Sequence, residues 1–548
     1  MKSKSPTFKP YHQHQLMAIP PTFDELISAS HPVRVVNSIV DRIDIDSIWR
    51  QYQGGGRSSY HPRMLLKVLI YGYLCNIYSS RKLESAVQEN IYFMWLSGMQ
   101  QPDHNTINRF RCDRLKNVIK DIFAQVVLLM VDSGHVDLKS VYTDGTKIES
   151  KANRYTFVWG KSVKKSRQRI VEQLEELWNY TQEIAKEELQ DTRPSGFDAT
   201  DPQAIKDTIE QINQVLKGKK DVDKKVRQKV NYAKKHWPDA IERYNRDEEI
   251  LQQRNSYSKT DPDATFMRMK EDHMKNGQLK PGYNVQISTS DQIITHYSLH
   301  QNPTDTLTLE PHLESFKEAY GVMPEELTAD AGYGSEQNYE YLLKNNIDAY
   351  VKYPYFDKEQ KQRKGEHKNF IVADLHYNQA DNCYFCPMGQ RMDFIGLRKE
   401  KSDAGHLKTY SLYQAQNCAD CPVRGVCYNA KGDRIIAVNH RLNELKNQAN
   451  ALLTSDAGVE HRKKRCCDVE SVFGNIKSNK GFRRFLLKGL DKVSVEFGIL
   501  AIGHNCAKLA KLLALEDFLR FFSCVFGSLF SKSRHIRTFE AQKLLLKI

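Results

Sequence analysis

The chain has 548 residues, a formal net charge of +14 and a sequence pI near 9.0. That length suits roughly three to four units of domain size, and the charge suits a polyanionic partner, nucleic acid before acidic lipid. The first residues contain no apolar run of signal-peptide length, and the late apolar runs 497–515 and 518–530 carry polar residues or are too short to cross a bilayer. Eleven cysteines favour reduced thiols or a metal site over a disulfide framework. We therefore expect a cytoplasmic protein with no membrane partner.

The first segment, residues 1–135, is predicted to be a helical domain. Apolar residues recur at helical spacing through three stretches, 61–77, 79–90 and 106–131. The run PDHNTINRFR, residues 102–111, could form a short recognition helix. One interpretation is a domain that binds DNA ends or forms multimers, with Arg109, Arg111 and Arg114 facing phosphates. The other is an ordinary helical bundle whose basic residues are only solvated.

The next segment, residues 136–160, carries the first candidate acid. The β-prone run SVYTDGTKI, residues 140–148, breaks at an Asp-Gly pair, which places Asp144 at the carboxyl end of a predicted strand. Lys147 and Glu149 lie close in sequence and are weaker candidates. Ligand sites of α/β sheets collect at the carboxyl ends of strands, so the position favours a functional role for Asp144.

A charged segment, residues 161–279, follows the first core strand. It is dense in Lys, Glu, Gln and Arg, yet apolar residues return at heptad-like spacing, as at Ile170, Leu174, Leu177 and Ile184. This pattern predicts an inserted, coiled-coil-like helical pair. The alternative is a disordered charged linker, which would not keep apolar residues three and four positions apart.

Residues 280–353 return to the predicted core. The runs 282–288 and 293–300 alternate as a hairpin, and a helix over 305–320, a strand over 326–329, a helix over 336–345 and a strand over 348–352 follow. The second candidate acid, Asp330, ends the strand in ELTADAGYGSE and precedes a Gly-rich turn. Two aspartates at strand ends could share hard cations with a further carboxylate.

A cysteine-rich insertion is predicted over residues 354–455. Cys383 and Cys386 form one CxxC pair, Cys418 and Cys421 form another, and Cys427 follows. Thiolates at CxxC spacing fold around tetrahedral zinc, and about thirty residues between the pairs suit a ribbon-like module. Five cysteines are one too many for four ligands, and a cluster of reduced structural thiols is the alternative.

The segment 456–515 carries the third candidate acid, and residues 516–548 are predicted as a tail helix. Glu470 stands in EHRKKRCCDVESVFGNIKSNKGFRRFLLKG, residues 460–489, where apolar residues at helical spacing predict an amphipathic helix. Lys477 lies two turns after Glu470 and so on the same face. A carboxylate that binds metal beside cations that grip phosphate is what phosphodiester cleavage needs. A solvated basic helix with an incidental acid is the alternative.

The motifs YTDGTKIES, TADAGYGSEQNYEYL and VESVFGNIKSNKGFRRFLLKG resemble those of bacterial insertion-sequence transposases of the DDE type. The N-terminal runs FKPYHQHQLMAIPPTFDELI and HPVRVV resemble the domain that precedes the catalytic core in many of them. The resemblance implies an α/β (mixed α+β) fold with a ribonuclease-H-like core. Its mixed sheet would have its second and third strands antiparallel, and Asp144, Asp330 and Glu470 would form the catalytic triad.

The resemblance also implies residues that contact DNA and metals. Relatives carry Tyr-x2-Arg-x3-Glu-x6-Lys, in which Lys477 fits but the Tyr and Arg positions hold Lys463 and Cys466. Arg465 is one residue out of register, so either Arg465 or Arg462 could do the arginine's work. The expected DNA-binding residues are Lys477, Arg465, Arg483 and Arg484. Relatives pair a Cys-Pro-x-Gly turn with three later cysteines, which gives a preferred zinc set of Cys386, Cys418, Cys421 and Cys427.

The implied activity is a DDE transposase that acts on double-stranded DNA. Water attacks a phosphodiester at the element's end, and the freed 3′-hydroxyl attacks target DNA. Two Mg²⁺ or Mn²⁺ ions held by the triad would activate the nucleophile and stabilise the leaving oxygen. The expected partners are the terminal inverted repeats, target DNA and a second copy of the chain in a DNA-bound homodimer. The alternatives are a ribonuclease-H-like nuclease without strand transfer and a decayed, transposase-derived DNA-binding protein.

Overall fold

The computed structural model describes residues 22–52, 59–185, 200–219, 222–269, 278–361, 370–402 and 405–526, with side chains described as far as residue 516. The chain divides into two compact units. The first contains Met1–Val118 and Ile499–Ile548, and the second contains Ile119–Gly498. The candidate triad, the DNA-binding residues that follow from the resemblance and the candidate zinc ligands belong to the second unit, whereas Arg109, Arg111 and Arg114 belong to the first.

Short helices make up the N-terminal part of the first unit, which also contains the described part of a long C-terminal helix from Ile499 on. The helix α4 forms its centre, and Leu65, Leu66 and Leu69 on that helix are almost fully buried. The start of α4 follows from sequence, because His61 caps it by accepting from the backbone N–H of Arg63 and Pro62 stands in its first turn. The described helices are α1 (Phe23–Leu26), α2 (Pro32–Arg42), α3 (Asp46–Trp49), α4 (Pro62–Leu74), α5 (Ser80–Glu89), α6 (Ile91–Ser97), α7 (His104–Arg109) and the π-helix η1 (Phe110–Arg114).

The predicted single helix over 106–131 is interrupted. A π-helix follows α7, and α8 (Ile119–Asp132) starts after a turn. Arg111, in the π-helix, is only 3% exposed and donates to the hydroxyl of Tyr73 at 3.0 Å and the carbonyl of Tyr78 at 2.8 Å. The prediction that Arg111 faces DNA phosphates is therefore wrong, because its guanidinium is buried and bonded within the unit.

A mixed sheet forms the centre of the second unit, so the predicted α and β class is confirmed. β5 is antiparallel to β1 and β6 is antiparallel to β5, whereas β7 is parallel to β1 and β8 is parallel to β7. β4 also pairs with β5. The strands are β1 (Ser140–Glu149), β4 (Thr265–Arg268), β5 (Leu279–Ser290), β6 (Ile293–His300), β7 (Glu326–Ala329) and β8 (Asp348–Val351).

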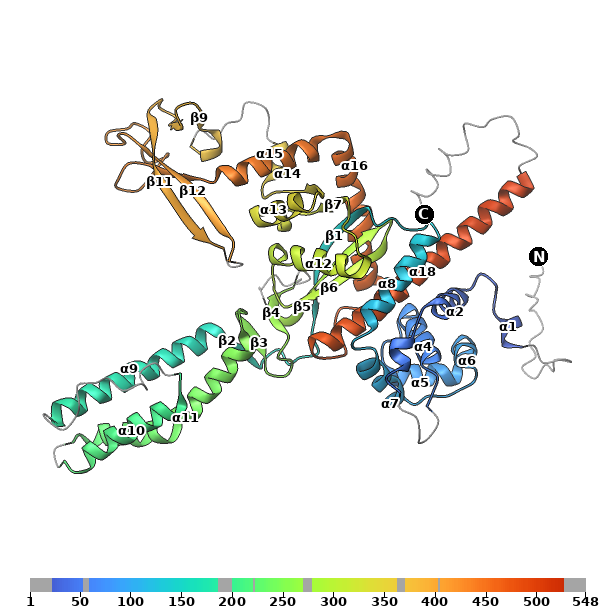
Figure 1. Ribbon diagram of the computed structural model, residues 1–548, viewed down its shortest axis with the longest axis horizontal. Helices are drawn as coiled ribbons and strands as arrows, with labels where there is room; N and C mark the ends of the chain where they lie inside the picture. The colour runs from blue at the N-terminus through green and yellow to red at the C-terminus, as the bar shows by residue number, and fades with distance from the viewer. Residues whose placement is uncertain are drawn as a thin grey trace, which may run out of the picture. The chain divides into compact units, whose positions relative to one another are not determined.

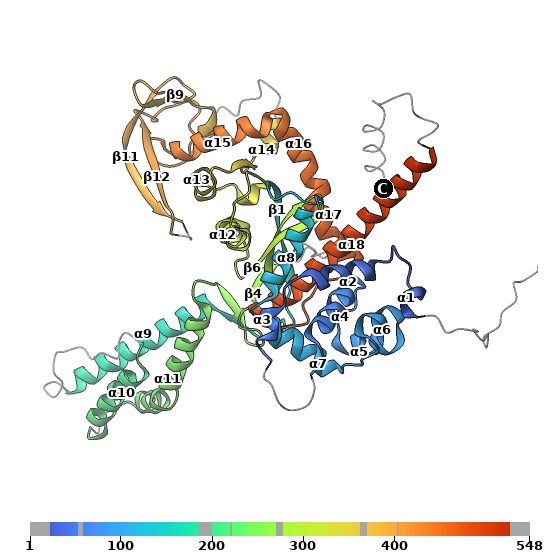
Figure 2. The ribbon, with the colours of Figure 1, turned by 45° about the vertical axis from the view of Figure 1, so that its right-hand side comes forward.

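Helices pack on both faces of this sheet (Figure 1, Figure 2). α12 (Leu309–Tyr320) and α13 (Glu336–Lys344) share a hydrophobic core with β1, β7 and β8, in which Leu313, Phe316 and Leu342 are fully buried. The helical run that begins with α16 (Asp456–Arg465) lies on the other side. Since side chains alternate along a strand, residues 143 and 145 of β1 share the α12 face, and residues 142 and 144 share the α16 face.

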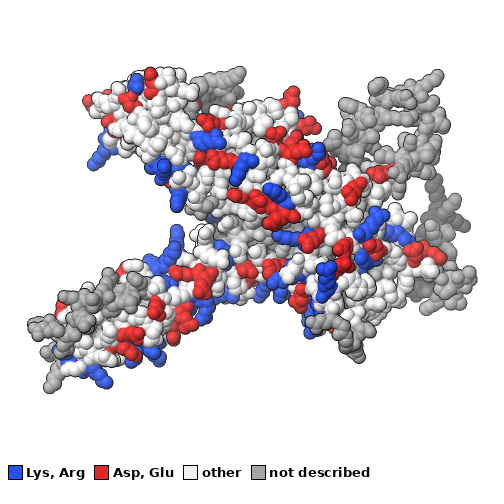
Figure 3. Space-filling view, in the orientation of Figure 1, with Lys and Arg blue, Asp and Glu red and all other residues white. Residues whose placement is uncertain are grey.

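The charged insertion forms three helices among its described residues, where a pair was predicted. α9 (Gly160–Ala185), α10 (Pro202–Lys217) and α11 (Lys224–Leu251) pack around a core that includes Leu174 and Ile209. The start of α10 is encoded locally, since Asp201 caps its N-terminus and proline follows. Acidic and basic side chains are interspersed along these helices on the face shown in Figure 3, so that face of the insertion is not a purely basic stripe. β2 (Phe157–Trp159) and β3 (Ser256–Ser258) pair at the base of the insertion.

The cysteine-rich segment contains a five-stranded antiparallel sheet in the order β13-β12-β11-β10-β9. Its core includes Tyr384, Met392 and Tyr413, and Cys386 and Cys418 pack against that core. The long β11–β12 hairpin was not predicted. Its strands are β9 (His376–Asn378), β10 (Cys383–Phe385), β11 (Arg391–Lys401), β12 (Leu407–Ala415) and β13 (Ile435–Val438).

The last described part of the chain is mostly helical. The helix predicted over 460–489 is wrong in its second part, since helical structure ends at Asn479 and residues 480–489 form no helix, with Gly481 and Gly489 at positive φ. α15 (His440–Thr454) precedes α16, and the run then continues through a π-helix, α17 (Ser471–Gly474) and a second π-helix. The final helix, α18 (Leu490–Phe526), is long and apolar enough over Leu490–Glu516 to cross a membrane, but 61% of its most apolar window is buried within the structure. That burial is typical of a core helix in a soluble protein. The rest of the predicted tail, residues 527–548, lies outside the described residues.

Candidate active site

The parallel pairing of β1 with β7 brings the two predicted aspartates together. Tyr142 of β1 is paired with Thr328 of β7, so two residues further along each chain stand Asp144 and Asp330. Asp330 directly follows β7, as predicted, and accepts from the backbone N–H of Gly332 at 2.8 Å. The two carboxylates therefore lie at one edge of the sheet because the register of the two parallel strands is fixed.

The prediction that Asp144 ends its strand is wrong. β1 continues to Glu149, because β5 pairs with it antiparallel over its whole second half, from Asp144–Ile287 to Glu149–Gly282. The Asp-Gly pair is not a turn in this setting. The pairing with β7, in contrast, stops at Tyr142. Asp144 is therefore paired with β5 but lies beyond the end of the pairing with β7.

The helix that carries Glu470 is held to the sheet by polar contacts around it. The ring nitrogen Nδ1 of His461 lies 3.0 Å from the hydroxyl of Tyr142. Asp468, which is 2% exposed, accepts from the backbone N–H of Gln292 at 3.0 Å. Burial raises the pKa of the Asp468 carboxyl above its ordinary value. Glu470 itself keeps 49% of its side chain exposed and is directed to the edge where Asp144 lies.

One guanidinium, that of Arg465, contacts all three predicted carboxylates. Its Nη1 lies 2.9 Å from Oε1 of Glu470, and its Nη2 lies 3.4 Å from Oδ2 of Asp144 and 3.9 Å from Oδ2 of Asp330. The Arg465 side chain is 11% exposed and the Asp144 side chain is 7% exposed. The structure thus brings the three predicted acids around a single buried cation.

A π-helix explains why Arg465, rather than Arg462, reaches the acids. In an ordinary α-helix, residues five apart do not share a face. Residues Cys466–Glu470 form the π-helix η6, whose i→i+5 bonding places Arg465 and Glu470 together. Arg462 instead lies over the ring of Phe356, with 5.3 Å between its guanidinium carbon and the ring centroid. Single inserted turns of this kind are frequent at functional sites, and the one sign of it in the sequence was that Arg465 lies one residue out of register with the family signature.

A further acid, Asp305, was missed from sequence. It starts the short 3₁₀ turn η3 (Asp305–Leu307), and its Oδ1 accepts from Nδ2 of Asn284 at 2.8 Å and from Nε2 of Gln286 at 2.9 Å. Burial raises the pKa of the Tyr333 hydroxyl well above its ordinary value, and Asp305, Asp144 and Asp330 raise it further. Asp305 therefore adds negative charge close to the predicted triad. The only sequence signal is an acid in a turn after a strand, which is common in loops.

The other predicted DNA-binding residues follow Glu470. Lys477 stands in the second π-helix, η7 (Asn475–Asn479), and its carbonyl accepts from Nε of Arg483 at 3.1 Å. Arg483 is exposed, whereas Arg484 donates to the carbonyl of Ser150 at 3.1 Å. The segment lies against the end of β1, because the backbone N–H of Phe485 donates to the carbonyl of Glu149 at 2.9 Å. Both arginines are thus exposed, and each also donates from Nε to a backbone carbonyl, Arg483 to that of Lys477 and Arg484 to that of Ser150.

The donor chemistry suits two kinds of metal. Carboxylate oxygens are the ligands of Mg²⁺ and Mn²⁺, and thiolates are ligands of zinc. Two of the predicted thiols accept backbone N–H groups, Cys386 from Gln390 at 3.3 Å and Cys418 from Arg434 at 3.4 Å. Across the described residues, however, no three His, Cys, Asp or Glu side chains are placed to hold one metal ion. In the acidic site, the guanidinium of Arg465 lies among the three carboxylates.

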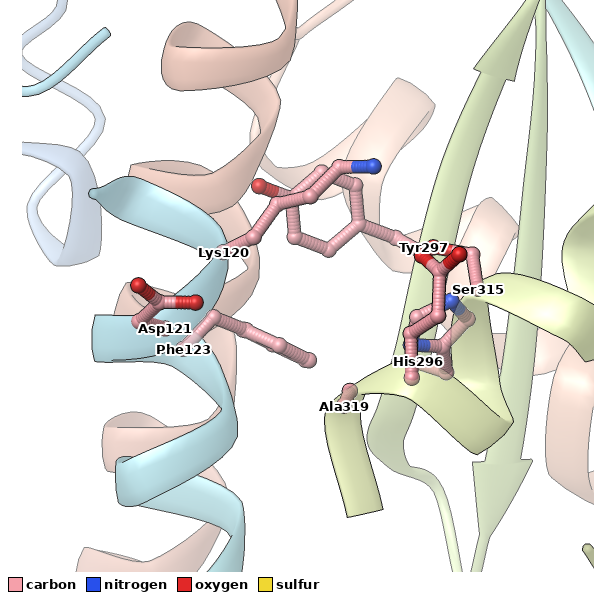
Figure 4. A pocket seen from close by; sticks show the side chains of 8 residues that line it. Lys120, Asp121, Phe123, His296, Tyr297, Ser315 and Ala319 are labelled. Carbon is pink, nitrogen blue, oxygen red and sulfur yellow. The ribbon is translucent and has the colours of Figure 1, made fainter. Parts of the chain in front are cut away.

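A separate cavity of about 110 Å³ lies between α8, β6 and α12 (Figure 4). It is lined by Lys120, His296 and Ser315, among others, and contains none of the predicted site residues. Burial lowers the pKa of His296 to about 3 and that of His300 to about 4. Both imidazoles are therefore neutral at pH 7, so His296, the one of the two that lines the cavity, adds no positive charge that would attract an anion.

Two models of protein families match the chain. The model described as Transposase DDE domain matches residues 385–510, and the model described as Transposase domain (DUF772) matches residues 21–113. Glu470 and the four preferred cysteines lie inside the first match, whereas Asp144 and Asp330 lie outside both. Searches of curated proteins and of solved structures returned no match.

Proposed function

The chain is an insertion-sequence transposase of the DDE type, and from that premise we propose that it binds the ends of its element, cleaves them and joins them to target DNA. The single observation that carries the proposal is that the side chains of Asp144, Asp330 and Glu470 converge. All three contact one guanidinium, that of Arg465. The order of antiparallel and parallel strands around β1 is the order expected of a ribonuclease-H-like core. Together these features support Asp144, Asp330 and Glu470 as the catalytic triad.

The roles of the residues follow from their chemistry. Transposases of this family typically use a divalent metal, and here Asp144, Asp330 and Glu470 would hold two Mg²⁺ or Mn²⁺ ions that activate the attacking oxygen and stabilise the leaving one. Lys477 and Arg483 would bind phosphates beside the scissile bond, since their cations follow Glu470 along the chain. Asp305 would add negative charge that favours cations in the site.

The remaining parts fit the same activity. A homodimer would bring two DNA ends together, with the helical first unit as the domain that binds ends or forms multimers. One zinc ion, held by Cys386, Cys418, Cys421 and Cys427, would stabilise the small sheet β9–β13. A soluble, cytoplasmic protein at the nucleoid fits a DNA substrate.

The test replaces Glu470 with glutamine, which keeps the size of the side chain but removes the charge that binds a cation. Cleavage of element-end DNA with Mg²⁺ should fall by at least about a hundredfold, while DNA binding persists or improves slightly because a repulsive carboxylate is gone. The matched control is Glu460→Gln, an exposed glutamate ten residues earlier in the same helical run, which should cleave normally.

The outcomes separate the alternatives. Normal cleavage by Glu470→Gln would show that Glu470 is only a surface acid and would refute the proposed triad. Cleavage without joining to target DNA would favour a nuclease that lacks strand transfer. Binding without any cleavage by the unaltered protein would favour a decayed DNA-binding protein.

A further inference from the structure

We propose that Arg465 is an internal counter-cation of the acidic site. Its guanidinium occupies the position between Asp144, Asp330 and Glu470 that divalent cations need, and it must leave before they bind. The inference rests on the proposed function, because it assumes that these carboxylates are the metal ligands. It goes beyond that function by giving Arg465 a role in the protein without metal, where it controls access of cations to the site.

The contact geometry supports an exchangeable cation. Arg465 forms a hydrogen-bond-length contact only with Glu470, at 2.9 Å, and its distances to Asp144 and Asp330 are 3.4 and 3.9 Å. Glu470 is also the most exposed of the three carboxylates, with 49% of its side chain accessible. The strongest single contact is therefore made to the acid that water can reach most easily, which makes the pairing weaker than a fully buried one.

The guanidinium is also incompletely satisfied. Its Nε is buried and has no hydrogen-bond partner among the described residues. A buried donor without a partner costs free energy, so the Arg465 guanidinium is held less tightly than a fully bonded one would be. In addition, one positive charge faces three carboxylates, so the site keeps an excess of negative charge that a divalent cation would neutralise better.

The backbone has the form that this contact requires. The π-helix η6 brings Arg465 beside Glu470, and without that extra residue the guanidinium would lie on another face of the helix. The neighbouring cations have other partners, since Lys464 pairs with Asp291 at 2.9 Å and Arg462 lies over Phe356. Within this run, Arg465 is the basic residue that the described contacts direct to the acids.

The experiment measures Mn²⁺ binding to the full chain by calorimetry, without DNA. Arg465→Gln should bind Mn²⁺ at least tenfold more tightly than the unaltered protein, because the competing charge is gone. Arg462→Gln is the matched control, since it makes the same chemical change three residues away, and it should leave the affinity unchanged. Asp144→Asn should abolish the site in both the unaltered and the Arg465→Gln backgrounds.

Thermal unfolding gives a second readout. Without metal, Arg465→Gln should melt at a lower temperature than the unaltered protein, because three carboxylates then repel one another, and Mn²⁺ should raise its melting temperature more. If Arg465→Gln does not fold, Arg465→Lys replaces it, since one ammonium cannot contact three carboxylates at once, and it should bind Mn²⁺ several-fold more tightly.

Two results would overturn the proposal in distinguishable ways. Mn²⁺ binding that depends on Asp144 but is equally tight with and without the arginine would refute the counter-cation role and leave the proposed transposase chemistry intact. Binding that never depends on Asp144 would refute the metal site of the proposed function, and the counter-cation role with it.

Discussion

Gly145→Ala tests whether the site depends on close packing beneath β1. A methyl group at this position would collide with Nε2 of Gln286 and would lie 2.6 Å from Oδ1 of Asp305. Those two atoms are themselves joined by a hydrogen bond of 2.9 Å. Forcing a methyl group into a packed interior costs about 1–3 kcal/mol, and a lost hydrogen bond to a carboxylate costs about 1.5–3 kcal/mol. Because the two costs overlap, we expect a loss of about 2–4 kcal/mol in stability.

Two assays test this expectation. Urea unfolding measures the stability of the second unit, and a cleavage assay on element-end DNA measures activity. Cleavage should fall as well, because Gly145 adjoins Asp144 in β1. The control is Gly474→Ala, where an added methyl group meets nothing within 4 Å and the residue is helical. That change should be neutral or slightly stabilising. If Gly145→Ala is as stable as Gly474→Ala and cleaves normally, the polar packing beneath β1 does not support the site.

Three further predictions concern binding, metal and pH. Lys477→Ala should weaken DNA binding and lower the slope of log affinity against log salt by about one unit. Some cleavage should survive at high protein concentration. An unchanged slope would exclude a phosphate contact. Purified protein should carry about one zinc per chain. Cys418→Ser should release this zinc, whereas Cys466→Ser, at an exposed cysteine outside the set, should retain it. Metal analysis that finds no zinc, with all thiols titratable, would refute the zinc site. The depressed pKa values of His296 and His300 mean that the unfolded chain takes up protons near pH 6.5 while the folded chain does not. The free energy of unfolding is therefore unaffected by these two histidines above about pH 6.5, where both are neutral in the folded and the unfolded chain. Between about pH 6.5 and pH 4 it falls by about 1.4 kcal/mol per pH unit for each histidine, because the unfolded chain binds the extra protons. His296→Gln should reduce that slope, and an unchanged slope in urea unfolding between pH 7 and 5 would contradict it.

The sequence by itself determined most of the local structure. Alternation predicted the β5–β6 hairpin, and the strand β7 was predicted with its observed bounds, 326–329. Helical periodicity likewise predicted α13 to within one residue. These elements follow from the spacing of apolar side chains, which a single chain displays without reference to its neighbours. The three candidate acids were also proposed from sequence, through motifs that resemble a family.

Tertiary structure decided what those elements do together. Asp-Gly at 144–145 was predicted to end a strand, but pairing with β5 carries β1 through it, since a ladder on one side outweighs local turn preference. The described residues of the charged insertion form three helices rather than the predicted pair, and Leu174 and Ile209 are buried in the core that these helices share. Above all, Arg465 lies one residue further from Glu470 than the family signature has its arginine, and the π-helix η6 accommodates that extra residue. Arg465 therefore lies among the acids. That arrangement depends on how the helix packs on the sheet, and residue spacing along one chain does not carry that information.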